Sequence, residues 1–202
     1  MSSEVAGRSS PGGRAVLVVI SGPSGAGKTS ICKALLTRMP NSRWSVSATT
    51  RPPRPGEMNG ESYEFLTREA FDRRLAADEF LEWAEYIGHR YGTPRRPVTE
   101  ALSSGQSVIM EIDVQGGIQV AKKLPDSIRL FILPPSQESL RARLEGRRTE
   151  AEEQLRKRLA EADGEIAAAR DSRCYPFFVV NDILESTVEE VLRIIERERQ
   201  KR

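Results

Sequence analysis

The chain has 202 residues, enough for one domain with a sizeable core and inserted or appended segments. Its 31 lysine and arginine residues nearly balance its 29 aspartate and glutamate residues, so the composition lacks the basic field that nucleic-acid binding requires. Two cysteines, Cys32 and Cys174, lie far apart without metal-ligand spacing, and no apolar run reaches the length of about 18 residues that spans a membrane.

The scarcity of cysteine favours a reducing, cytoplasmic location. Residues 1–14 are rich in serine, glycine and arginine and have no apolar stretch of the kind found in signal peptides. We therefore expect a disordered N-terminal tail, followed by one folded domain over residues 15–202.

The first informative motif is a glycine-rich loop at residues 21–29, with the sequence SGPSGAGKT. It matches G-x-x-x-x-G-K-[ST], follows an apolar run at residues 15–20 that predicts a buried strand, and precedes a helical pattern at residues 30–39. Strand, loop and helix form the context in which this motif, the P-loop, binds a nucleoside triphosphate. In that role its backbone N–H groups meet phosphate oxygens, Lys28 reaches the β- and γ-phosphates, and the Thr29 hydroxyl ligates Mg²⁺.

The next region, residues 45–95, lacks long buried runs and is predicted to be a smaller segment inserted into an α/β core. Residues 43–50 are predicted to form a short strand that ends in a polar turn, and residues 89–94 to form a loop. Three prolines stiffen the loop at residues 51–57. Thr67 is predicted to cap a helix.

A P-loop identifies the phosphate donor, so the inserted segment is expected to bind the acceptor. Arg51 and Arg54 on the stiffened loop, with Tyr63 downstream, could hold a phosphate group through charge-assisted hydrogen bonds, or could form a solvated loop. Glu82 has apolar neighbours, and a partly buried carboxylate needs donors. Guanine offers N1–H and N2–H₂ side by side, whereas adenine does not. The alternative for Glu82 is a helix-end glutamate that faces water.

After the inserted segment the pattern of a buried core returns. Apolar strands at residues 107–113, 127–133 and 177–180 alternate with helices, which predicts a parallel α/β sheet. Glu111 and Asp113 alternate at the end of the first of these strands, so both are expected on one side, toward a metal ion or the acceptor.

Two helices are predicted between the strands at residues 127–133 and 177–180. The first covers residues 136–145, and the second runs from a capping box at residues 149–152 to about residue 171. Thr187 is predicted to cap the final helix. Arginines on the first two helices could close over the triphosphate as a mobile lid, or could pair with glutamates on a solvent face. These arginines are Arg143, Arg147, Arg148 and Arg158. The single histidine, His89, is assigned no role.

Together, these motifs resemble the guanylate kinase family, which transfers a phosphoryl group from ATP to GMP. The resemblance extends from about residue 16 to the last helix and rests on separated stretches: the P-loop, SVSATTRPPRPGE at 45–57, FLEW at 80–83, YGT at 91–93, EIDVQG at 111–116, RLEGR at 143–147 and VND at 180–182. It implies an α/β fold with a P-loop nucleoside monophosphate kinase-like parallel sheet core (15–44, 96–135 and 173–202). An inserted GMP-binding segment (45–95) and a mobile helical lid (136–172) would complete it.

Carried over position by position, the resemblance implies a role for individual residues. The GMP phosphate would be held by Ser47, Arg51, Arg54, Tyr63 and Tyr91, with Ser47 alternatively beside the base. Guanine would be read by Glu82, Thr93 and Asp113. ATP would be bound by Gly22, Pro23, Ser24, Gly25, Ala26, Gly27, Lys28, Thr29, Arg143 and Arg147, with Asn181 and Asp182 beside the adenine. The catalytic set would be Lys28, Arg51, Arg147 and Arg158.

We therefore predict Mg²⁺-dependent transfer of the γ-phosphoryl group of ATP to GMP, giving ADP and GDP, in purine nucleotide metabolism. The enzyme is expected to be cytoplasmic, a monomer or a homo-oligomer, and to bind neither nucleic acid nor a membrane. One alternative is a scaffold domain of this fold that binds a protein ligand, which the intact Lys28 and Thr29 disfavour. Another is an enzyme of the same class that phosphorylates a different acceptor. Glu82 and Thr93 would distinguish GMP from such an acceptor.

Overall fold

The computed structural model describes residues 14–86, 88–145 and 152–201, so most of the predicted tail, Arg147, Arg148 and most of the predicted capping box lie outside it. Within these ranges, five parallel strands form a central sheet in the order β2-β7-β1-β8-β9. The strands are β1 (Leu17–Ser21), β2 (Ser42–Trp44), β7 (Ser107–Glu111), β8 (Ile128–Leu133) and β9 (Phe177–Val180). The predicted parallel α/β sheet is thus confirmed.

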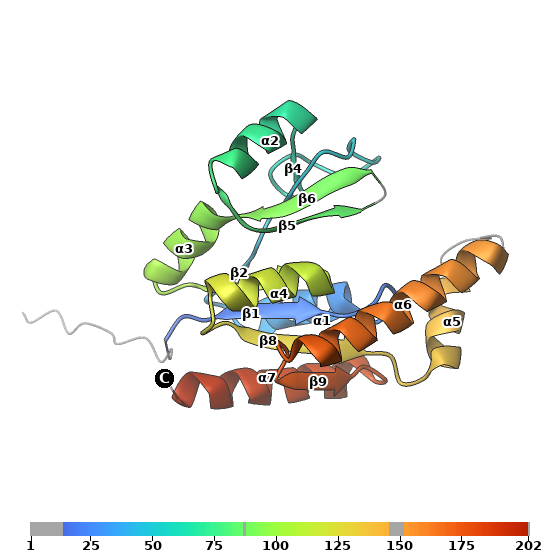
Figure 1. Cartoon of the computed structure of the whole chain (residues 1–202). Coiled ribbons are helices and arrows are strands. Elements are labelled where there is room, and N and C mark those ends of the chain that lie inside the picture. Colours follow the sequence, from blue (N-terminus) through green and yellow to red (C-terminus); the bar gives the residue numbers. More distant parts are fainter. Residues whose placement is uncertain (1–13, 87, 146–151, 202) are drawn as a thin grey trace, which may run out of the picture.

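Helices cover both faces of the central sheet (Figure 1). On one face, Val18 and Ile20 of β1 pack with α1 (Lys28–Arg38) and α7 (Leu184–Gln200). On the other, Leu17 and Val19 pack with α3 (Arg95–Ser103) and α4 (Val114–Lys123). Because successive strand residues point to opposite faces and both faces are covered, β1 is apolar along its whole length before Ser21.

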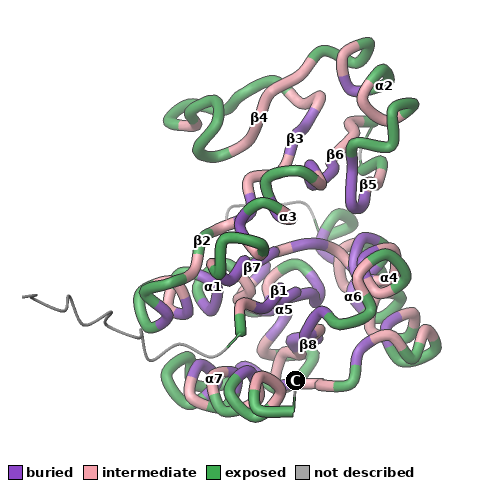
Figure 2. Tube along the Cα trace, turned by 90° about the vertical axis from the view of Figure 1, so that its left-hand side faces the viewer, coloured by how far each residue is buried: buried purple, intermediate pink, exposed green. Residues whose placement is uncertain are grey.

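A second sheet lies above the first in Figure 1, with strand order β4-β3-β6-β5. Its strands are β3 (Ala48–Thr49), β4 (Glu64–Phe65), β5 (Phe80–Tyr86) and β6 (His89–Pro94), and α2 (Arg68–Ala76) packs on it. Ala48, Phe71 and Phe80 form a small apolar cluster of their own, with the two rings stacked at 4.4 Å. Figure 2 shows that burial here is concentrated on the strands, while the loops are exposed.

Helices α5 (Gln137–Glu145) and α6 (Glu152–Ser172) project from one side of the core (Figure 1). Leu140 and Leu144 of α5 pack against Leu155 and Ala162 of α6, again as a separate cluster. The C-terminal end of α6 returns to the core, where Ala169 packs with Phe131 and Tyr175. In the described part of the chain, no helix is long and apolar enough to cross a membrane.

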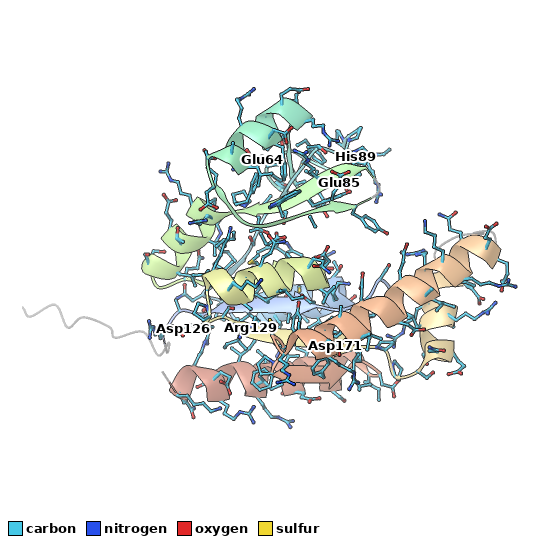
Figure 3. All side chains as sticks on the ribbon, in the orientation of Figure 1. Glu64, Glu85, His89, Asp126, Arg129 and Asp171 are labelled. Carbon is cyan, nitrogen blue, oxygen red and sulfur yellow. The ribbon has the colours of Figure 1, made fainter. Side chains whose placement is uncertain are left out.

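Two strand predictions were wrong. Residues 43–50 do not form one strand, because the chain crosses there from β2 of the central sheet to β3 of the second. Residues 89–94 are not a loop: they form β6, which pairs antiparallel with both β3 and β5. His89 pairs with Tyr86 at the start of this strand, and Figure 3 labels it beside the turn of the hairpin. The glycine and proline that suggested a loop lie within and at the end of β6.

Two predictions at helix starts also need correction, whereas a third is confirmed. Glu111 ends β7 but Asp113 is the N-cap of α4, so they do not alternate along one strand. Thr187 does not cap α7, which begins at Leu184, and its hydroxyl instead donates to the Ile183 carbonyl at 3.0 Å. The predicted cap at Thr67 is confirmed, since its hydroxyl oxygen accepts from the Ala70 N–H at 3.1 Å.

Because the second sheet has its own apolar cluster, Phe71→Ala is expected to destabilise it locally, by about 3–5 kcal/mol. Amide hydrogen exchange should accelerate strongly in β5 and β6 and little in β1 and β8. Arg73→Ala, at an exposed position of the same helix, is the matched control and should change exchange little. Equal acceleration in β1 would show that the two sheets unfold as one unit.

Candidate active site

The P-loop connects the end of β1 to α1 and is packed tightly against two other strand ends. Gly22 and Gly27 have φ angles of 147° and 92°, values that L side chains rarely adopt. A Cβ atom at Gly22 would collide with the Ile132 carbonyl oxygen, and one at Gly27 with the Asn181 amide. Glycine at these positions therefore allows the loop to lie directly on the carboxyl ends of β8 and β9.

Lys28, the first residue of α1, folds back over the loop. Its Nζ donates to the carbonyl oxygens of Gly22 at 2.6 Å and Pro23 at 3.0 Å. Burial lowers the pKa of Lys28, while the negative charge of Glu111 opposes that shift. The ammonium group is thus held at the loop on which the phosphates of a nucleotide would lie.

Thr29 and Glu111 lie together beside the loop, and their side-chain oxygens could hold a divalent cation. The Thr29 hydroxyl donates to Glu111 Oε1 at 2.9 Å, and Glu111 stands at the carboxyl end of β7. Among the described residues, no group of three or more His, Cys, Asp or Glu side chains converges as a metal cage. This arrangement suits Mg²⁺, which takes few protein oxygens and completes its shell with water and substrate phosphates.

Side chains from the chain's C-terminal third converge on the same loop. Asn181, which follows β9, donates from its side-chain Nδ2 to the Ala26 carbonyl at 2.7 Å. The backbone carbonyl of Asn181 accepts from the Arg143 guanidinium at 2.9 Å. Arg158 on α6 donates to the Ser24 hydroxyl at 2.9 Å. Asp182 is exposed next to Asn181. Of the sequence-predicted ATP and lid residues, Arg147 and Arg148 lie outside the described residues.

A buried carboxylate forms the centre of a second group. Glu82 on β5 is 5% exposed, and its Oε1 accepts from the Thr93 hydroxyl at 2.5 Å, across the β5–β6 pair. The Ser47 hydroxyl lies 3.3 Å from that of Thr93. Burial raises the pKa of Glu82 to about 7, with a further contribution from the negative charge of Asp113. No helix end facing water is involved, so that alternative for Glu82 is excluded.

The second group reaches the core through the first turn of α4. Asp113 caps this helix, with its Oδ1 accepting from the Gly116 N–H at 2.7 Å. Glu82 Oε2 approaches Gly116 so closely that a Cβ there would lie 2.6 Å from it. Glycine at position 116 therefore admits the Glu82 carboxylate to the start of α4.

A third group surrounds Arg51 on the proline-rich loop. Its guanidinium pairs with Glu57 at 2.8 Å and lies 5.5 Å from the centroid of the Tyr63 ring, while the Tyr63 and Tyr91 rings are 6.1 Å apart. The hydrogen bond to Glu57 raises the pKa of Arg51, and burial raises that of Tyr63. Arg54 is exposed, and its backbone N–H donates to Glu57 at 2.7 Å. Glu57 therefore fixes the guanidinium of Arg51 and the backbone of Arg54.

Sequence reasoning missed several residues that shape these groups. Glu57 and Gly116 lie within the stretches that carry the family resemblance, but neither was given a role. Tyr175 carries no motif, although its hydroxyl contacts the Ser21 hydroxyl at 3.0 Å and the Val114 carbonyl at 3.3 Å. Glu165 on α6 contributes charge near Lys28, and burial raises its pKa to about 7. No local pattern around Tyr175 or Glu165 could have revealed these contacts.

The sequence was also compared with known proteins. A family model described as guanylate kinase matches residues 14–198. The chain belongs to the guanylate kinase family. It is 50% identical over 184 residues to a guanylate kinase of Rubrobacter xylanophilus, covering 91% of this chain and 95% of that protein. A guanylate kinase of Symbiobacterium thermophilum is 47% identical over 186 residues, covering 92% and 87% respectively.

A solved structure agrees with this assignment. The crystal structure of guanylate kinase from Anaplasma phagocytophilum matches with a TM-score of 0.72 and 31% identity, covering 93% of this chain and 87% of that one. The chain is therefore an ATP-dependent nucleoside monophosphate kinase, a phosphotransferase whose substrates are ATP and GMP. The alternative of a non-catalytic scaffold domain does not fit these relatives.

The close approach of Glu82 to α4 generates a prediction at Gly116. Gly116→Ala should displace the Glu82 carboxylate and raise the KM for GMP about ten-fold, leaving the KM for ATP within about two-fold. Steady-state kinetics with each substrate varied in turn measures this split. Gly164→Ala is the control, because nothing lies within 4 Å of a Cβ there; it should only stabilise α6, by about 0.5–1 kcal/mol. An unchanged KM for GMP in Gly116→Ala would contradict the close approach.

Proposed function

We propose that this chain transfers the γ-phosphoryl group of Mg²⁺·ATP from the P-loop to GMP bound against the second sheet. The observation that carries the proposal is the position of Glu111 and Asp113, two residues apart on either side of the turn from β7 to α4. Glu111 contacts Thr29 on the P-loop side, and Asp113 lies with Gly116 and Glu82 on the other. The two substrates would thus meet at the carboxyl ends of the parallel strands, where α/β folds bind ligands.

On the donor side, the backbone N–H groups of the P-loop and the Lys28 ammonium would bind the phosphates of ATP. Arg143 and Arg158 already contact the loop or its Asn181 neighbour, and with Arg147 they would neutralise charge on the transferring phosphoryl group. Asn181 and Asp182 would lie beside the adenine. No covalent intermediate is required, because the oxygen of the GMP phosphate attacks in line.

Thr29 and Glu111 would hold Mg²⁺ beside the P-loop, Thr29 through its hydroxyl and Glu111 directly or through water. When bound, the metal would supply positive charge that stabilises the negative charge of the phosphates during transfer.

On the acceptor side, Arg51, Arg54, Tyr63 and Tyr91 would hold the GMP phosphate by charge-assisted and hydroxyl hydrogen bonds. Glu82 would accept from the N1–H and N2–H₂ groups of guanine, with Thr93, Asp113 and Ser47 completing the recognition of the base. The 3.3 Å separation of the Ser47 and Thr93 hydroxyls supports the base as the partner of Ser47. Adenine would leave the buried carboxylate without donors and would be rejected.

The separate apolar clusters of the second sheet and of the α5–α6 pair support a division into core, GMP-binding segment and lid. Each outer unit can then move without opening the core, so that closure on both substrates excludes water as a competing acceptor. Cytoplasmic location and a monomeric or homo-oligomeric state remain part of this proposal.

Replacing Glu82 with Gln is expected to lower kcat/KM for GMP by about 10²-fold or more, because the amide presents an N–H₂ group to the donors of guanine. The KM for ATP should stay within about two-fold. A coupled ADP-release assay with ATP, Mg²⁺ and each of GMP, AMP, CMP and UMP measures both. The unmodified protein should respond to GMP and not to AMP. Equal loss of affinity for ATP and GMP in Glu82→Gln would exclude a role in reading the base.

The raised pKa of Glu82, about 7, predicts a pH-dependent affinity for GMP. Guanine needs the ionised carboxylate, so the Kd for GMP should fall about ten-fold from about pH 6 to about pH 8 as Glu82 loses its proton. Isothermal titration calorimetry across this range gives the Kd. Glu82→Gln serves as the baseline, because it retains any dependence due to the GMP phosphate itself. Identical pH profiles for both proteins would rule out titration of Glu82 as the cause.

A further inference from the structure

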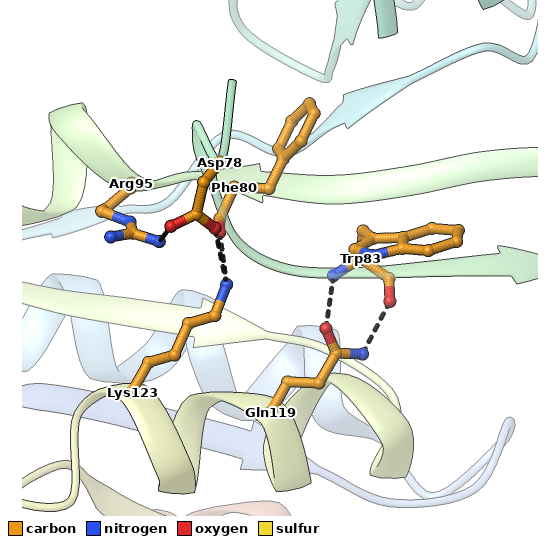
Figure 4. A network of polar contacts seen from close by, with 6 residues as sticks. All are labelled: Asp78, Phe80, Trp83, Arg95, Gln119 and Lys123. Atoms are coloured by element: carbon orange, nitrogen blue, oxygen red, sulfur yellow. Dashed lines mark hydrogen bonds and ion pairs between the residues drawn. The ribbon is translucent and has the colours of Figure 1, made fainter. Parts of the chain in front are cut away.

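Helix α4 holds the outer edge of strand β5 through a side-chain amide (Figure 4). β5 is an edge strand of the second sheet, next to β6, and no strand of the described chain pairs with its outer edge. Gln119 occupies that edge. Its Oε1 accepts from the Trp83 N–H at 3.1 Å, and its Nε2 donates to the Trp83 carbonyl at 2.7 Å. A neighbouring antiparallel strand would make this same pair of bonds.

Three positions on one face of α4 contact β5 in succession. Gly116 faces the Glu82 carboxylate, Gln119 holds the peptide groups of Trp83, and Lys123 donates to the Phe80 carbonyl at 2.8 Å. The spacings of three and four residues place them in line along the helix. In Figure 4 Lys123 also reaches Asp78, which accepts from Arg95 as well.

The strand is irregular at the point where its position matters most. The pairing of β5 with β6 shifts register between Phe80 and Glu82, immediately before the carboxylate that faces α4. Irregularities of this type bend a strand and change the direction of the next side chain. Pairing with β6 alone therefore leaves the direction of Glu82 weakly determined, and Gln119 holds the peptide of the very next residue.

We propose that Gln119 is a positioning residue for guanine recognition: it anchors Trp83 so that the neighbouring Glu82 carboxylate stays between Thr93 and the start of α4. This inference rests on the proposed role of Glu82 as the reader of the base. Without the amide, the peptide N–H and C=O of Trp83 lose their partners, and β5 shifts toward other partners. A carboxylate that must meet two donors side by side tolerates little displacement, so base selectivity falls before phosphate binding does.

The test uses the full chain with Gln119→Met, which keeps the length of the side chain and removes both hydrogen bonds. kcat/KM is measured for GMP and for IMP, which lacks the N2 amino group, together with the KM for ATP. We expect the preference for GMP over IMP to fall about ten-fold, with the KM for ATP within about two-fold. The preference is a ratio within one preparation, so it does not depend on the fraction of folded protein.

Lys123→Met is the matched control, because it removes a bond from the same helix face to the same strand but not at the residue next to Glu82. It should lower the melting temperature while leaving the preference for GMP within about two-fold. If Gln119→Met does not fold, Gln119→Glu retains the acceptor for the Trp83 N–H, loses the donor, and should lower the preference about three-fold or more.

An unchanged preference in the Gln119 variants, or an equal fall in Lys123→Met, would overturn the positioning role and leave only a structural connection between α4 and β5. Failure of the unmodified protein to prefer GMP over IMP would instead refute the proposed role of Glu82. The two failures are therefore distinguishable in the same set of assays.

Discussion

The turn that joins β7 to α4 is the constraint on which both halves of the proposed site depend. Glu111 at its start contacts Thr29, which follows the P-loop glycines, and Asp113 caps the helix that the Glu82 carboxylate approaches at Gly116. The turn follows a strand whose neighbours β1 and β2 pair with it on both sides, so the buried sheet holds it in place. The turn thereby fixes the positions of the proposed donor-side and acceptor-side residues relative to each other, although they come from different segments.

In the proposed function, recognition of the base depends on a carboxylate that the fold buries almost completely. Glu82 is 5% exposed and Thr93 is 0% exposed, and the Thr93 hydroxyl donates to the Glu82 side chain at 2.5 Å. Such a carboxylate is costly to ionise, which is why burial moves its pKa to about 7. A base with two adjacent donors, such as guanine, would pair with the ionised carboxylate. A base without them would leave the charge unpaired and bind more weakly, which would make the site selective.

The sequence by itself determined the elements whose information is local. A β-branched apolar run, a glycine loop and a helical pattern lie within residues 15–39, so the P-loop and its flanking strand and helix follow from neighbouring residues alone. The parallel α/β class and the cap at Thr67 follow in the same way. Local context made Arg51, Arg54, Tyr63 and Glu82 candidates but left a solvent-exposed alternative open for each. Ser47, Tyr91 and Thr93 came instead from separated motifs shared with a family, because spacing in one sequence cannot show which loops meet.

Only the tertiary structure decided how those motifs meet. β6 was predicted to be a loop because its own residues include a glycine and a proline, and its strand conformation comes from pairing with β3 and β5. Gln119 and Trp83 are 36 residues apart, Thr29 and Glu111 are 82 apart, and Tyr175 and Ser21 are 154 apart. No local pattern encodes such contacts, because they form when the central sheet brings distant strand ends to a common edge.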